Sequence, residues 1–294
     1  MLAAADTTAA TTPHSRGIPS ESMSGICITR GLAAQRHGRF VSGSSGHPDR
    51  MAPDIAAALI RRYTAPGDLV FDPLAGTGTT LVEAIHADRN AAGIEYEPGW
   101  TALARANLAL ASRSGAPGHA RIVCGDATRL PRGLPAGVRG QVRLLLTSPP
   151  SRRTMPGHDP TAGGLQFTGR NPPPAGHPNR GRLPLIDGLA AVMAGSLPLL
   201  TPDGIVVITA RSRDAEQQLD MPGTIIRAGL TAGLTLINWY RTCDGRVPRR
   251  HPQTHSSDYR RAAGCRPSTA APQRTIRDHI AVFIRTTLPP AGTT

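Results

Sequence analysis

The chain has 294 residues, of which 39% are hydrophobic and 3% aromatic, and this length suits one α/β domain with extensions. Its 32 glycines and 28 prolines predict that a sizeable share of the chain is loop or disorder. The formal net charge is +13, and all 33 basic residues are arginine. A basic surface suits a polyanionic partner such as nucleic acid, while a coding bias toward arginine is an alternative explanation for the missing lysine.

The cysteine pattern and the hydropathy of the chain exclude several classes of protein. The four cysteines stand far apart and form no CxxC pair, so neither a zinc site, nor any other metal site, nor a disulfide framework is predicted. The first twenty residues lack the basic and apolar regions of a secretory signal, and no apolar run approaches the length of a transmembrane helix. We therefore expect a cytoplasmic protein without a membrane partner; its oligomeric state stays open.

Three regions of different order are expected along the chain. Residues 1–45 are rich in Ala, Thr, Ser and Gly without hydrophobic periodicity, which predicts a mostly disordered tail with order beginning near His47. One ordered domain is expected over residues 46–286, with a flexible tail at 287–294. Two stretches rich in Arg, Pro and Gly interrupt the domain at about 151–182 and 244–274, and loops of such length are usually functional or disordered.

Strands and helices alternate through the domain. Helices are predicted at Met51–Thr64, Thr79–Asp88, Pro98–Ala111, Leu183–Leu200 and Pro222–Ala232. Strands are predicted at Asp68–Asp72, Ala91–Glu95, Ala120–Asp126, Val142–Pro150, Gly204–Arg211, Thr235–Tyr240 and His279–Ile284. This alternation predicts an α/β fold: a Rossmann-like, seven-stranded, mostly parallel sheet with helices on both faces.

A glycine-rich turn follows the first strand, in the segment VFDPLAGTGTTLVEA. Gly76 and Gly78 let the backbone approach a ligand closely, and either Thr79 or Thr80 can cap the helix that follows. The segment lacks the lysine of a phosphate-binding P-loop, and Leu81 stands where a nicotinamide fingerprint has its third glycine. A different polar ligand is therefore favoured.

Carboxylates end three successive predicted strands. Asp72 ends the first, Glu95 ends the second and Asp126 follows the third. The ends of parallel strands meet at one edge of a sheet, where Glu95 can accept hydrogen bonds from ribose hydroxyls and Asp126 from an adenine amino group. One such acid alone would indicate no more than a solvated strand end, but the three together with the glycine turn indicate a nucleoside cofactor.

The stretch from about residue 46 to 150 resembles S-adenosylmethionine-dependent DNA methyltransferases that modify exocyclic amino groups, which carry a D-P-F-x-G-[ST]-G-T-T loop followed by R-x-x-x-G-I-[ED]. The resemblance implies S-adenosylmethionine as cofactor. It places beside the methionine part of the cofactor His47, Pro48 and Met51. By this resemblance, Glu95 would bind the ribose of the cofactor and Asp126 its adenine. The amino acid end of the cofactor would be held by Asp72, Gly76, Thr77, Gly78 and Thr79. Neighbouring positions also expected to contact the cofactor are Ala75, Tyr96 and Ala127.

The fourth strand ends in Ser148-Pro149-Pro150, where the family resembled has [DNS]-P-P-[YFW]. An exocyclic amine is a poor nucleophile because its lone pair is delocalised into the ring. The Ser148 hydroxyl and the Pro149 carbonyl can accept hydrogen bonds from the N–H groups of this amine, which favours the tetrahedral nitrogen that attacks the methyl group. The two prolines hold this carbonyl in place. The aromatic that would stack on a flipped base is replaced by Ser151.

The resemblance implies site-specific methylation of DNA, of the restriction–modification kind, with the serine of the motif favouring N4 of cytosine over N6 of adenine. The two arginines after the motif, Arg152 and Arg153, are candidates for phosphate contacts. Two alternatives stay open. One is methylation of a base in RNA, and the other is a degenerate methyltransferase fold that binds its ligands without turnover.

Overall fold

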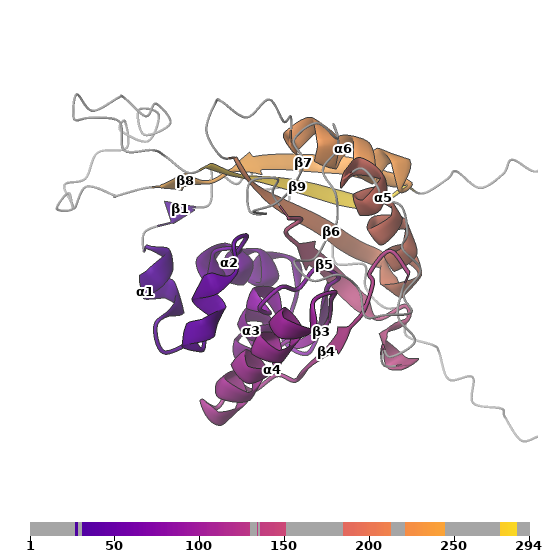
Figure 1. Ribbon diagram of the computed structural model, residues 1–294. Helices are drawn as coiled ribbons and strands as arrows, with labels where there is room; N and C mark the ends of the chain where they lie inside the picture. Colours follow the sequence, from indigo (N-terminus) through magenta and orange to yellow (C-terminus); the bar gives the residue numbers. More distant parts are fainter. Residues whose placement is uncertain are drawn as a thin grey trace, which may run out of the picture.

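A computed structural model of the chain describes residues 27–28, 31–129, 134, 136–150, 185–212, 221–244 and 277–286. Its main sheet has seven strands in the order β4-β3-β2-β5-β6-β9-β7 (Figure 1). The strands are, in chain order, β2 (Leu69–Asp72), β3 (Asn90–Glu95), β4 (Ala120–Cys124), β5 (Val142–Thr147), β6 (Leu200–Ser212), β7 (Leu234–Arg241) and β9 (Arg277–Arg285).

The sheet is mostly parallel, which confirms the predicted fold class. The five strands from β4 to β6 pair in parallel, whereas β9 pairs antiparallel with both β6 and β7. The chain crosses over on each side of β2, since its neighbours are β3 and β5. The strand order therefore reverses at β2, and a ligand crevice is expected outside the carboxyl ends of β2 and β5.

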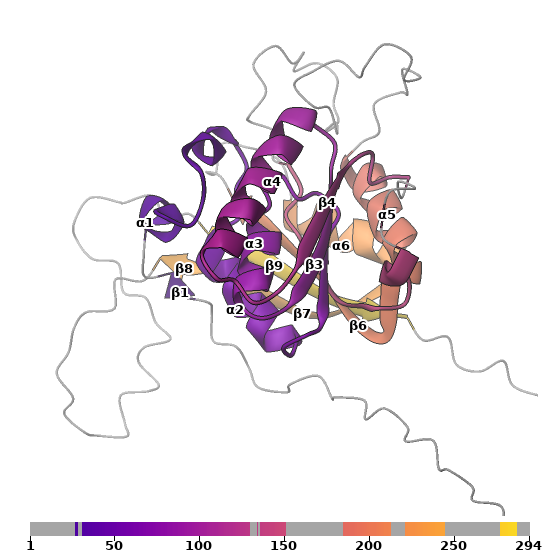
Figure 2. The same ribbon diagram turned by 90° about the horizontal axis from the view of Figure 1, so that it is seen from below.

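Helices cover both faces of the sheet (Figure 2). One face is covered by α2 (Pro53–Tyr63), α3 (Thr79–His86) and α4 (Pro98–Arg113), and the other by α5 (Leu185–Ser196) and α6 (Met221–Thr231). Each face has its own cluster of buried apolar side chains. Short 3₁₀ helices are η1 (Ser42–Gly46), η2 (Ala136–Val138) and η4 (Leu197–Leu199).

The helix boundaries follow local sequence signals. Pro53 and Pro98 stand in the first turns of α2 and α4, where a missing N–H costs no hydrogen bond. The expected side-chain cap of α3 is wrong, because the residue before the helix is Gly78 in the left-handed conformation (φ 79°) and no side chain caps the helix. The Thr79 hydroxyl instead accepts a hydrogen bond from Arg36.

The expected disorder of residues 1–45 is also wrong for the part that the structure describes. Here lie β1 (Cys27–Ile28), α1 (Leu32–Arg36) and η1, and the Phe40 side chain is buried in the core. β1 pairs in parallel with β8 (Cys243–Asp244), so the segment is tied to the chain after β7. Long-range contacts order it in place of hydrophobic periodicity.

The two Arg/Pro/Gly-rich stretches fall almost wholly outside the described residues, as do most of the expected tails. Among the helices that are described, none is both long and apolar enough to cross a membrane.

Candidate cofactor and catalytic site

The three predicted carboxylates lie at one edge of the sheet. Asp72 ends β2, Glu95 ends β3, and Asp126 follows β4, and these adjacent strands are parallel. Burial is the main cause that raises the pKa of Glu95, and the negative charge of Asp72 adds to the rise. The sequence-based prediction that these acids share an edge is confirmed.

The glycine loop turns tightly between β2 and α3. The Ala75 N–H donates to the Ile94 carbonyl at 2.9 Å, which attaches the loop to β3, and the Gly78 N–H donates to the Ala75 carbonyl at 2.7 Å. Gly76 and Gly78 have φ of 53° and 79°, a region that glycine adopts without the steric cost other residues meet. A Cβ on Gly76 would lie 3.0 Å from His47 Nε2, so the upstream segment closes over the loop.

Glu95 is a buried carboxylate held in the loop. Its Oε2 accepts the Gly76 N–H and its Oε1 accepts the Glu97 N–H, both at 2.8 Å. Burial raises the pKa of Glu95 to about 7, although these two hydrogen bonds oppose the rise. A ligand that donates hydrogen bonds to this carboxylate would stabilise its charged form.

Asp72 lies deeper and links two strands. Its Oδ1 accepts the Thr147 hydroxyl at 2.6 Å and the Leu74 N–H at 3.0 Å. Burial raises the pKa of Asp72 to about 6, and the bond from Thr147 works against this rise.

The outer end of the edge combines an acid with an exposed ring. Asp126 Oδ1 accepts the Thr128 N–H at 2.9 Å and the Thr128 hydroxyl at 2.7 Å. Tyr96, which follows Glu95, has 42% of its surface exposed, and Ala127 is buried beside the edge. An exposed aromatic next to two acids is suited to stacking on a nucleobase.

The upstream segment packs beside the loop. The His47 ring lies edge-on to Trp100, with ring centroids 4.8 Å apart, and burial lowers the pKa of His47 to about 4. His47 is therefore neutral at physiological pH. Pro48 follows it, and Met51, two residues before α2, is buried in the core.

The motif Ser148-Pro149-Pro150 directly follows β5, the strand next to β2. Pro149 is buried, while Ser148 and Pro150 are half-buried. The motif is thus at the same edge as the acids. Arg152 and Arg153 lie outside the described residues, as does Ser151.

Comparison with known proteins agrees with this geometry. Residues 29–105 match the profile of the DNA methylase family N6_N4_Mtase. We call this stretch the DNA-methylase segment, because it is similar to that family. The DNA-methylase segment includes the upstream residues, the glycine loop and Glu95, whereas Asp126 and the Ser-Pro-Pro motif follow it.

Two kinds of similar protein accompany the family match. A Type II methyltransferase, M.MjaII of Methanocaldococcus jannaschii, is 28% identical over 67 residues, which is 23% of this chain and 13% of that protein. The crystal structure of TrmN from Thermus thermophilus superposes with a TM-score of 0.50 at 21% identity, covering 85% of this chain and 53% of that one. A TehB-like SAM-dependent methyltransferase from Corynebacterium glutamicum superposes with a TM-score of 0.43 at 15% identity, covering 83% and 91% of the two chains.

The chain therefore spans about an eighth of the curated relative and about half of TrmN. The likeness to TrmN concerns the fold alone. The fold is that of class I methyltransferases, and the family match over residues 29–105 favours S-adenosylmethionine as the cofactor.

The DNA-methylase segment also contains a residue that sequence reasoning missed. Arg36, at the end of α1, donates to the hydroxyls of Thr79 at 3.1 Å and Thr77 at 3.3 Å, so it grips both sides of Gly78. Its guanidinium lies 3.9 Å from the centroid of the Phe40 ring. The only sequence signal was a pair of arginines within AQRHGRF. No structural role was predicted for them, because this part of the chain was expected to be disordered.

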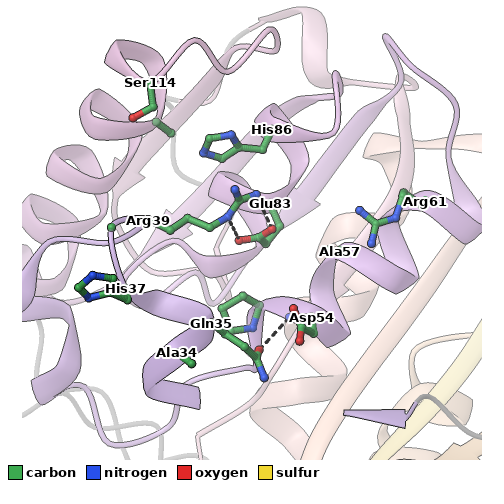
Figure 3. Close-up of a pocket in the computed structure, with 13 residues that line it drawn as sticks. Ala34, Gln35, His37, Arg39, Asp54, Ala57, Arg61, Glu83, His86 and Ser114 are labelled. Carbon is green, nitrogen blue, oxygen red and sulfur yellow. Dashed lines mark hydrogen bonds and ion pairs between the residues drawn. The ribbon is translucent and has the colours of Figure 1, made fainter. Parts of the chain in front are cut away.

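A cavity of about 520 Å³ lies on the outer face of the same segment, between α1, α2, α3 and the end of α4 (Figure 3). Arg39 and Glu83 form a bidentate ion pair in its wall, with both N–O distances at 2.7 Å. Gln35 and Asp54 lie beside this pair and join α1 to α2, since Gln35 Oε1 accepts the Asp54 N–H at 3.0 Å. None of the carboxyl-edge acids lines this cavity, so it is separate from the candidate cofactor site.

Proposed function

We propose that the protein is a site-specific DNA methyltransferase that transfers a methyl group from S-adenosylmethionine to an exocyclic amino group, N4 of cytosine in preference to N6 of adenine. The observation that carries this proposal is the place of Ser148-Pro149-Pro150. The motif follows β5 next to β2, and therefore stands beside the glycine loop at the point where the strand order reverses.

The residues at this edge fit the cofactor. Each oxygen of Glu95 accepts one N–H, and a carboxylate oxygen can accept further bonds, so the ribose hydroxyls are suitable donors. Tyr96 offers an exposed ring for the adenine, and Asp126 offers an acceptor for its amino group. Gly76 and Gly78, both with positive φ, form the tight turn that we place beside the amino acid end of the cofactor. When bound, S-adenosylmethionine supplies a methyl group on a positively charged sulfonium.

The task of the protein's own residues is to make a weakly nucleophilic amine reactive. In our proposal the Ser148 hydroxyl and the Pro149 carbonyl each accept a hydrogen bond from one N–H group of the target amine. This draws the amine away from conjugation with the ring and stabilises the transition state more than the ground state. The buried Thr147 supports them, because its bond to Asp72 ties the end of the catalytic strand to the cofactor strand.

The polyanionic partner in this proposal is DNA. The target base must leave the helical stack to reach the motif, and the net charge of +13 favours binding to phosphates. Arg152 and Arg153, which follow the motif in sequence, are the proposed phosphate contacts. A role of the restriction–modification kind in the cytoplasm is part of this proposal, and the similarity to a Type II methyltransferase supports the methyltransferase part of it.

The test is methylation of DNA by the purified full chain. Genomic DNA that carries no amino methylation is incubated with the protein and S-adenosylmethionine, digested to nucleosides and analysed by mass spectrometry. We expect N4-methylcytosine in DNA and none in a parallel reaction with total RNA. Modified RNA with unmodified DNA would contradict the proposal in favour of an RNA base.

A matched pair of serine variants tests the catalytic assignment. Ser148→Ala should reduce the rate by about 100-fold, as does the loss of one transition-state hydrogen bond elsewhere. Ser112→Ala, on the exposed surface of α4, should leave the rate unchanged. Full activity of Ser148→Ala would show that another group accepts the amine.

A further inference from the structure

Arg36 carries a positive charge into the protein interior beside the glycine loop. Only 8% of its surface is exposed. Its described contacts are the hydroxyls of Thr77 and Thr79 and the face of the Phe40 ring, all of them neutral. A buried guanidinium therefore touches the loop without a carboxylate partner among the described residues.

The surroundings of Arg36 make this charge more costly. Burial and the nearby Arg50 lower the pKa of Arg36 to about 10, so the group stays protonated at neutral pH. Glu83 is the carboxylate that attracts it, but both oxygens of Glu83 already accept hydrogen bonds from Arg39. The N-terminus of α3 adds partial positive charge at the same place. A buried charge whose nearest carboxylate is already paired with another arginine is unfavourable, and an anionic ligand would reduce this cost.

The position of Arg36 is held by its neighbours on both sides. Arg39, three residues later, grips Glu83 in α3, and Gln35 accepts the Asp54 N–H at the start of α2 (Figure 3). These contacts fasten α1 and the residues just after it to α2 and α3. Arg36 is consequently presented to the loop by a fixed segment.

We propose that Arg36 binds the carboxylate of the cofactor's amino acid end, and that it makes the site selective for a nucleoside bearing this carboxylate. The inference rests on the proposed function. A carboxylate suits the site better than a DNA phosphate does, because Arg36 is buried and its hydrogen bonds go to the glycine loop. A duplex backbone needs an exposed cation.

The test compares two ligands that differ in one group. S-adenosylmethionine and decarboxylated S-adenosylmethionine are titrated calorimetrically into the full-length protein and into Arg36→Gln. The unmodified protein should bind the carboxylate-bearing ligand about 10- to 100-fold more tightly, as expected for a charge-assisted hydrogen bond. Arg36→Gln should lose this preference while its affinity for the decarboxylated ligand changes little.

Two further variants separate binding from structure. Arg105→Gln removes an exposed charge from α4 and should keep the preference. Arg36→Lys keeps the charge but not the forked donor geometry, and should retain part of the preference even where Arg36→Gln folds poorly. Equal weakening of both ligands by Arg36→Gln, or weakened DNA binding alone, would overturn the inference.

Failure of the inference differs from failure of the proposed function. Unmodified protein that binds both ligands equally would overturn the role of Arg36 and leave methyl transfer standing. Unmodified protein that binds neither ligand would overturn the proposed function, and the inference with it.

Discussion

The Thr147 hydroxyl donates a 2.6 Å hydrogen bond to Asp72 Oδ1 and thereby joins the last residue of β5 to the last residue of β2. Both side chains are buried, so the bond is made away from solvent. It couples the strand that leads into the Ser-Pro-Pro motif to the strand that leads into the glycine loop. The bond adds a side-chain link between the ends of two strands that already pair through their backbones.

Loss of the Thr147 hydroxyl should destabilise the protein in a pH-dependent way. Asp72 has a folded-state pKa of about 6, above its ordinary value of 3.8, so ionising it costs folding free energy as the pH rises through this range. Thr147→Val removes a donor that stabilises the ionised form. We expect a loss of about 1–3 kcal/mol at pH 8 and a smaller loss at pH 5, where Asp72 is protonated. Urea unfolding of the ligand-free protein measures the loss of stability at each pH. Equal losses at pH 5 and pH 8 would contradict a role of Thr147 in stabilising ionised Asp72.

The affinity for S-adenosylmethionine should rise with pH through about 7. Glu95 has a pKa of about 7 in the ligand-free protein, and hydroxyl donors favour its ionised form. Below this pKa a proton must leave before the ligand binds, which weakens binding by up to about tenfold per pH unit. Calorimetry between pH 6 and 8.5 should show this rise, accompanied by proton release.

Glu95→Gln is the control for this pH dependence. The amide cannot ionise, so binding should be weaker at pH 8 and nearly flat between pH 6.5 and 8.5. His47 does not confuse the result, because its pKa of about 4 lies below this window. A slope that persists in Glu95→Gln would assign the titration to another group.

A side chain at Gly76 should weaken cofactor binding in addition to lowering the stability of the fold. Ala at this position meets both a left-handed φ of 53° and His47 Nε2 at 3.0 Å. Gly140 is the matched control, since its φ is 71° but no atom lies within 4 Å of its would-be Cβ. Each Gly→Ala change should cost about 1–2 kcal/mol of backbone strain. Only Gly76→Ala should also weaken S-adenosylmethionine binding, and His47→Ala should partly restore the binding. Identical behaviour of the two glycine variants would contradict contact between His47 and the loop.

Replacing one partner of the Arg39–Glu83 pair should destabilise the protein more than replacing both partners. Glu83 is 4% exposed and Arg39 33% exposed, so Arg39→Met leaves a nearly buried carboxylate without its counter-charge. We expect a loss of about 3 kcal/mol, near the low end for a buried pair because Arg39 is partly solvated. The double variant Arg39→Met/Glu83→Leu should recover much of this loss. Chemical denaturation of the three proteins gives the coupling, and additive effects would show that the pair contributes little.

The main sheet and the three acids could be predicted from sequence because their signals are local. Each strand of the first half is a short apolar run, and Asp72 and Glu95 end two of these runs. The rule that parallel strands end at one edge then brings the acids together without any knowledge of side-chain packing. The glycine turn was recognisable for the same reason.

The upstream part of the site could not be predicted in this way. α1 has only five residues, and its anchors are distant in sequence: Arg39 reaches Glu83 across 44 positions and Arg36 reaches Thr79 across 43. Such long-range contacts leave no hydrophobic periodicity in the sequence, so the segment was predicted to be a disordered tail. The cap of α3 was mispredicted for a related reason, since Arg36 engages the Thr79 hydroxyl that was expected to cap the helix.

An aromatic residue at position 151 should distinguish a slow enzyme from a binding protein. The family resembled has an aromatic after its two prolines, and base stacking is worth about 1–3 kcal/mol, or roughly 5- to 150-fold in rate when it acts in the transition state. Ser151→Tyr should therefore raise the rate of DNA methylation within this range and leave the affinity for S-adenosylmethionine unchanged. Ser151→Ala, which adds no ring, serves as the control. Single-turnover methylation measures the chemical step directly. An unchanged rate would mean that a residue elsewhere already stacks on the base, and no methylation in any of the three proteins would favour a fold that binds its ligands without turnover.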